Sequence, residues 1–270
     1  VFHVIASRVT YDLNRLDEHG IPQLAARQGP LLDADQFYGD STTSSCIQES
    51  DFAPYKPKCD ILLVNATAYA PESKPHRRWP VGLRIGEWQK TLVVTGPRYN
   101  DFGFLGWKVV EPEKTIEVPL RWELAYGGTC QWPMHPQNGQ DPEIWVPYEA
   151  NPLGRGWVEK AWLKKSQVAD VDAPQIEVFN KPFRTEDANA MRYPAIGLGP
   201  VGKWWTTRRQ KSGTYDQAWK ESRWPRLPKD FDFGYWNCAP EGQQIPYPEG
   251  GQEILLAGLT SGPHLFKCQL

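Results

Sequence analysis

The sequence predicts a mainly β fold built from antiparallel sheets, with a sandwich-like or open barrel-like core. In TIEVPLRWELAY (115–126), apolar and polar residues alternate with a period of two, which is typical of a half-buried strand. Segments 81–96 and 253–268 each hold two apolar runs joined by a tight turn, the pattern of a β-hairpin. The chain has 13 Trp and 25 Pro in 270 residues, which favours many turns, large aromatic packing units and few long helices.

The other β elements follow from shorter patterns. FHVIASRVTYDL (2–13) is interpreted as a strand and not as a signal peptide, because it lacks the basic region and the small-residue cleavage site of a signal peptide. CDILLVNATAYA (59–70) is an almost continuous apolar run and predicts one buried strand. Pro119 places the strand over 115–126 at an edge or a bulge. The hairpins are expected to turn near Gly86 and at Ser261, respectively.

Residues 129–249 have a different character, because Pro, Gly and Trp recur every few residues and long periodic runs disappear. In TYDQAWKESRW, Thr214 and Gln217 have the spacing of a capping box, which predicts a short helix that ends near Arg223. Further short helices are expected in TEDANAMRY and PVGKWWTTRRQ. We therefore expect a single domain over 1–270, with a β core from 1–128 and 250–270 and an irregular wrapping segment over 129–249.

Composition argues against several functional classes. The net charge of -2 gives no electrostatic drive toward nucleic acid or membrane, and no apolar run approaches the roughly 20 residues of a membrane span. Five widely spaced cysteines without a CxxC pair favour reduced thiols in a cytoplasm. Five scattered histidines give no metal-ligand spacing. We expect no cofactor and no metal.

The segment GLGPVG (197–202) has the spacing of a dinucleotide-binding fingerprint. That motif needs a strand before it and a helix after it, whereas Pro194 and Pro200 interrupt both. A glycine turn at a close backbone crossing is the favoured interpretation.

The carboxylates Asp230, Asp232 and Glu123 offer a second hypothesis. Glycosidases use a pair of carboxylates as catalytic groups, and aromatic side chains stack on their sugar substrates. The tryptophans of this chain would suit a sugar-binding surface. The favoured alternative is that KDFDFGYW (229–236) forms an edge strand, with aromatics inward and carboxylates outward near Arg and Lys.

An aromatic and basic cluster provides candidates for protein binding, because Trp, Tyr and Arg dominate interface hot spots. Two interpretations of WWTTRRQ (204–210) are equally favoured. In the first, the cluster is exposed and binds a partner; in the second, one tryptophan lies in the core and the arginines pair with carboxylates. The candidate protein-binding residues are Trp204, Trp205, Arg208, Arg209, Tyr215, Trp219 and Arg223.

Several blocks, taken in order, resemble one family. They are ESDFAPYKPKCDILLVNATAYAP, LVVTGPR, VPLRWELAYGGT, NPLGRGW, PAIGLGPVGKWWTTR, GTYDQAWKESRWPRLPKDFDFGYWNCAP and GGQEILLAGL. Together they are similar to the DUF2169 family of bacteria, over nearly the whole chain. The resemblance implies a role beside type VI secretion, as an adaptor or chaperone that loads an effector onto the secreted spike. It implies no catalytic residues.

The resemblance and the lack of a catalytic motif lead to one expectation. We expect a non-enzymatic cytoplasmic adaptor whose partners are a secreted effector, bound through its N-terminal region, and spike proteins of the VgrG and PAAR types. Nucleic acid and membrane are not expected partners. A carbohydrate-binding or carbohydrate-active β protein is the alternative.

Overall fold

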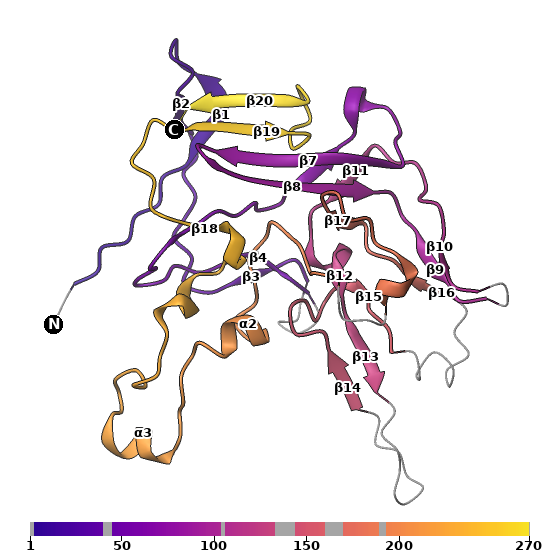
Figure 1. The fold of residues 1–270 in the computed structure, drawn as a ribbon. Coiled ribbons are helices and arrows are strands. Elements are labelled where there is room, and N and C mark those ends of the chain that lie inside the picture. Colours follow the sequence, from indigo (N-terminus) through magenta and orange to yellow (C-terminus); the bar gives the residue numbers. More distant parts are fainter. Residues whose placement is uncertain are drawn as a thin grey trace, which may run out of the picture.

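A computed structural model describes residues 3–39, 45–103, 106–132, 144–159, 170–188 and 193–269. Figure 1 shows the long strands β7, β8, β19 and β20 running across the upper part of the molecule, with β1 and β2 beside β20 and many of the shorter strands below them. The helix α3 lies at the tip of an arm that projects from the rest of the chain. The prediction of a mainly β, antiparallel fold is confirmed.

The largest sheet has five antiparallel strands in the order β17-β8-β7-β19-β20. Their bounds are Ile176–Val178 (β17), Trp88–Thr95 (β8), Arg78–Ile85 (β7), Glu253–Ala257 (β19) and Leu265–Gln269 (β20). Both predicted hairpins, β7–β8 and β19–β20, are present in this sheet. The sheet is open, with β17 and β20 at its edges, and β17 comes from the irregular segment 129–249.

The remaining described strands form small sheets around this one. All of their pairs are antiparallel except the parallel pair β12–β15. Their bounds are Tyr11–Leu16 (β1), Pro22–Leu24 (β2), Gln36–Phe37 (β3), Ile47–Glu49 (β4), Cys59–Asp60 (β5), Thr67–Tyr69 (β6), Tyr99–Asp101 (β9), Lys108–Val109 (β10), Glu117–Pro119 (β11), Tyr126–Gly127 (β12), Thr129–Trp132 (β13), Ile144–Pro147 (β14), Arg155–Gly156 (β15), Asp170–Asp172 (β16) and Gln244–Ile245 (β18).

Helical structure in the described ranges is short. The α-helices are α2 (Thr206–Arg209) and α3 (Gln217–Ser222). The 3₁₀ turns are η1 (Pro71–Ser73), η2 (Trp122–Leu124), η3 (Thr185–Ala188), η4 (Phe233–Trp236) and η5 (Glu241–Gln243).

One face of the five-stranded sheet covers the main core. Trp79 and Val81 of β7 point inward opposite Val94 and Leu92 of β8, and these side chains are almost fully buried. Burial of each such side chain contributes about 1.5–3 kcal/mol. Segments distant in sequence complete this core, among them Val118, Trp122, Leu198 and Trp205. A second buried cluster gathers aromatic side chains: Tyr126, Trp157, Phe183 and Tyr193.

The single strand expected over 115–126 is wrong. The chain leaves the sheet after Pro119, makes the turn η2, and resumes pairing only at Tyr126. The amide of Asn151 donates to the carbonyls of Trp122 and Tyr126, so these acceptors are not used in an antiparallel ladder. The burial alternation survives, because side chains 118, 120, 122 and 126 are still buried.

Three other expected strands also differ from the structure. The run 59–70 is split into β5 and β6, with Asn65 between them in the left-handed region (φ 54). The N-terminal strand β1 begins only at Tyr11. Segment 229–236 contains η4 instead of an edge strand, because the Asp232 carboxylate accepts from the main-chain N–H of Gly234 and caps the turn.

The expected short helices are present with different details. The helix over 217–222 begins at Asp216, whose side chain accepts from the N–H of Trp219, so the predicted Thr214 cap is wrong. Helix α2 lies in the expected PVGKWWTTRRQ segment. The segment TEDANAMRY holds the turn η3, and its residues 189–192 lie outside the described residues.

Candidate functional site

The predicted protein-binding cluster is divided between the interior and the surface. Trp205 is 2% exposed and packs edge-on against Trp122, with ring centroids 5.2 Å apart. Trp204 is partly buried against the same core. Arg208 is also buried, and its guanidinium donates to the main-chain carbonyls of Val201 and Tyr235 instead of to a carboxylate. These three residues therefore hold the fold together.

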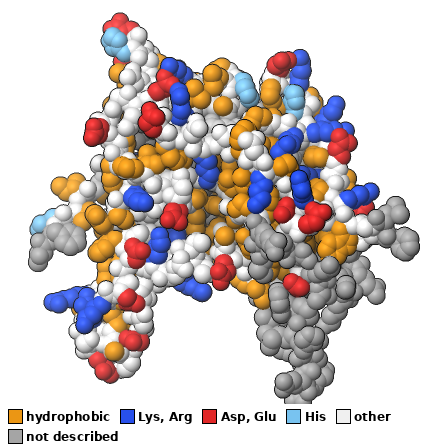
Figure 2. Space-filling view, viewed as in Figure 1, with side chains coloured by type: hydrophobic (Ala, Val, Ile, Leu, Met, Phe, Trp, Pro, Cys, Tyr) orange, Lys and Arg blue, Asp and Glu red, His pale blue; other side chains and the backbone are white. Residues whose placement is uncertain are grey.

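The other four candidates lie on the surface or on the projecting arm, which we define as residues 213–230. Arg209 is exposed at the end of α2. Tyr215 is 51% exposed and meets the ring of Trp219 edge-on at 4.7 Å. Arg223 is half-buried, and its Nε donates to the carbonyl of Leu227. Figure 2 shows both basic and acidic side chains along this arm.

Main-chain and side-chain hydrogen bonds fix the arm in shape. Asp230 closes its base by accepting from the N–H and the hydroxyl of Thr214, at 3.0 and 2.7 Å. The indole of Trp219 donates to the carbonyl of Arg226. Trp224, at 61% exposure, is left at the surface. The arm thus presents exposed aromatic rings on a scaffold that is internally hydrogen-bonded.

Each candidate catalytic carboxylate is engaged in a structural contact. The hydrogen bond from the Thr214 N–H lowers the pKa of Asp230, which opposes a role as a proton donor. Asp232 caps η4. Glu123 accepts from the N–H and the thiol of Cys46, at 2.8 and 2.7 Å, and burial raises the pKa of that thiol to about 12. Nothing in these contacts favours a glycosidase.

The glycines of GLGPVG serve close packing. A Cβ added to Gly197 would lie 2.9 Å from the ring of Trp122, and one added to Gly202 would lie 2.7 Å from the ring of Trp205. The indole of Trp122 also donates to the carbonyl of Gly199. Gly197 and Gly202 thus make room for indole rings, and the backbone crossing is at Leu198, whose carbonyl accepts from the N–H of Leu63.

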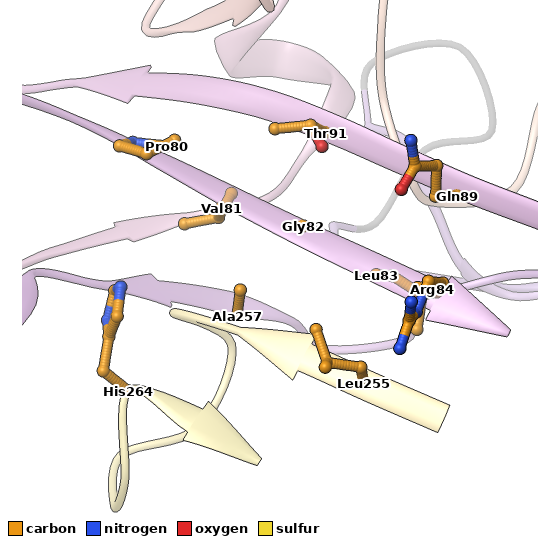
Figure 3. Close-up of a pocket in the computed structure, with 10 residues that line it drawn as sticks. All are labelled: Pro80, Val81, Gly82, Leu83, Arg84, Gln89, Thr91, Leu255, Ala257 and His264. Carbon is orange, nitrogen blue, oxygen red and sulfur yellow. The ribbon is translucent and has the colours of Figure 1, made fainter. Parts of the chain in front are cut away.

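The outward face of the central sheet carries a feature that the sequence analysis missed. Residues 80, 82, 91, 255 and 257 line a hollow of ≈ 310 Å³ over strands β8, β7 and β19 (Figure 3). A neighbouring hollow of ≈ 490 Å³ shares Pro80 and is lined also by Val93, Phe179 and Pro182. We call the two together the outer-face groove.

The groove exists because small residues lie at its centre. Ala257 and Gly82 are opposite each other in register, so both point to the same face. A Cβ on Gly82 would approach the Thr91 hydroxyl to 3.3 Å. Leu265 of β20 lies opposite Ala257 on this face and is 58% exposed, while Phe179 is 47% exposed. An apolar stripe therefore crosses the sheet.

Charged groups at the groove are paired with each other. Arg84 lines the first hollow and forms an ion pair with Glu253, which also contacts Lys267. Arg78 lines the second hollow and reaches Glu177, at 3.0 Å. The groove is consequently apolar at its floor, and at its rim each carboxylate pairs with two cations.

Comparison with known proteins gives one result. The family model described as "Uncharacterized protein conserved in bacteria (DUF2169)" matches residues 2–270. The chain belongs to the DUF2169 family. No curated protein and no solved structure matches it significantly. The resemblance inferred from the sequence blocks is confirmed at the level of the family.

Three further observations concern this DUF2169 chain. Among its described residues, no group of three or more His, Cys, Asp or Glu side chains is arranged to hold a metal ion. None of the helices in the same ranges is long and apolar enough to cross a membrane. The five cysteines are free thiols, four of them buried.

Proposed function

We propose that this DUF2169 chain is a non-enzymatic adaptor that binds an effector of the type VI secretion system in the cytoplasm. It would hold the effector, through the effector's N-terminal region, until it is loaded onto spike proteins of the VgrG and PAAR types. The outer-face groove is the observation that carries this proposal. An open apolar groove on a rigid sheet suits a partner that offers an apolar segment.

The physical work of such an adaptor is to cover apolar effector surface before loading. Binding the folded effector also stabilises it by mass action. The groove suits this role because its centre is apolar and its rim charges are already paired within the chain. An uncharged client segment can therefore enter without leaving a buried ion unpaired.

Co-expression with a candidate toxin from the neighbouring genes tests the proposal. The toxin is expected to co-purify with the chain, and its solubility and secretion are expected to fall without it. Equal solubility and equal secretion in the absence of the chain would refute the role.

A pair of matched variants tests the groove. Leu265→Glu places a charge at the groove, whereas Leu24→Glu makes the same change on the β1–β2 hairpin at nearly the same exposure, 59% against 58%. We expect at least a tenfold loss of affinity for Leu265→Glu and no change for Leu24→Glu. Equal binding by both variants would remove the groove as the client site.

A further inference from the structure

A separate hollow of ≈ 220 Å³ lies between α2, η4 and η5. Part of its wall is apolar and consists of Trp122, Ala195, Val201, Ala239 and Pro240. Ligand pockets for whole small molecules are usually about 300 Å³ or larger. The size therefore suits one end of a peptide better than a complete cofactor.

Arg208 brings a buried positive charge to this hollow. Its side chain is 5% exposed and contacts the ring of Tyr235, with its Cζ 5.4 Å from the ring centroid. Its hydrogen bonds go to main-chain carbonyls, and no carboxylate in the described ranges pairs with it. A buried cation without a counter-ion is costly, so an anion beside it would be stabilising.

Lys211 brings a second cation to the same wall. Its Nζ lies 3.3 Å from the position that a Cβ on Gly234 would take, so the ammonium lies against η4. Within the described part of the chain, this Nζ has no ion pair and no hydrogen bond. The wall also holds Asn237, which is 1% exposed and whose Oδ1 has no described hydrogen-bond donor.

We propose that this hollow binds the carboxylate of a peptide. The main-chain carbonyls of Tyr235 and Val201 use three of the five N–H donors of Arg208, so its guanidinium offers a carboxylate its positive charge and its remaining N–H donors. Lys211 adds a point charge. Glu241 also lines the hollow, so two cations and one carboxylate leave a local charge that one monoanion balances. The apolar wall contacts the aliphatic part of the peptide, and a peptide N–H can satisfy Asn237.

Titration of the intact chain with short peptides tests the site. The probes are acetyl-alanyl-alanine with a free carboxylate, its carboxamide, and inorganic phosphate. Binding is followed by the indole N–H resonance of Trp122, whose ring lines the hollow. We expect saturable shifts with the free carboxylate and at least tenfold weaker binding of the carboxamide and of phosphate.

Matched lysine variants complete the experiment. Lys211→Gln removes the cation in the hollow and is expected to weaken binding of the free carboxylate about tenfold. Lys220→Gln makes the same change on the exposed surface of α3 and is expected to bind unchanged. Equal binding of acid and amide, tighter binding of phosphate, or full affinity in Lys211→Gln would each overturn the proposal.

Discussion

Replacing Glu177 with glutamine removes the negative charge that holds two arginines at the β17 edge of the central sheet. Glu177 is 0% exposed and accepts from Arg98 at 2.7 Å and from Arg78 at 3.0 Å. It also accepts from the main-chain N–H of Phe183. Glutamine keeps an oxygen for that N–H and for Arg98, but it puts an NH2 donor where Oε2 accepts from Arg78. The substitution therefore removes the charge and the acceptor for Arg78.

The magnitude follows from the burial of each partner. The Arg98 side chain is 6% exposed, and loss of one partner of a buried pair costs about 3–5 kcal/mol. The Arg78 side chain is 43% exposed, so its separate contribution is small. Because Arg98 keeps its hydrogen bonds to the carbonyl of Pro174, we expect the lower end, about 3 kcal/mol.

Thermal unfolding followed by near-ultraviolet circular dichroism measures this loss. For a chain of this size, 1 kcal/mol lowers the Tm by about 2–4 °C, so Glu177→Gln is expected to lower it by roughly 6–12 °C. The control is Glu253→Gln, which also takes a charge from two cations, Arg84 and Lys267, but on the outer rim. Equal small losses in both variants would refute the reasoning.

Three further variants probe other parts of the structure. Burial alone would raise the pKa of Asp60, but hydrogen bonds from its lysine, amide and main-chain partners lower this pKa. The stabilisation by the ionised carboxylate is therefore present above about pH 4 and is lost on acidification. Asp60→Asn is expected to flatten the acid limb of a plot of Tm against pH. Burial lowers the pKa of Lys90 to about 8, so between about pH 8 and pH 10.5 the unfolded chain binds more protons than the folded chain. The free energy of unfolding should therefore rise with pH over this range. In denaturant titrations, Lys90→Met is expected to abolish this rise. Gly197→Ala forces a Cβ against the Trp122 ring and is expected to lower the free energy of unfolding by about 1–3 kcal/mol, measured by chemical denaturation. The control Gly242→Ala has open space at its Cβ and should be nearly neutral. Equal losses in the two variants would contradict the packing role of Gly197.

The sequence determined those elements whose signals are local. The two hairpins follow from alternation and turn residues within 16 residues of chain, and both are present. The short helix before Pro225 follows from its polar start and the proline. Family membership also follows from ordered blocks that are visible without coordinates.

The tertiary structure decided where the chain leaves those local patterns. Trp122 turns out of a strand because its indole reaches Gly199, which is 77 residues away, and Asn151 takes its carbonyl. The same kind of distant contact buries Trp205 and Arg208, whereas the sequence alone did not decide whether these residues lie at the surface or in the core.

The groove likewise depends on distant segments. Pro80, Gly82 and Ala257 form one floor only because β7 pairs with β19, across most of the chain. Periodicity reports which residues alternate, but it carries no information on which strands become neighbours or which sheet face stays open. Those outcomes depend on long-range packing, and that packing places the candidate site.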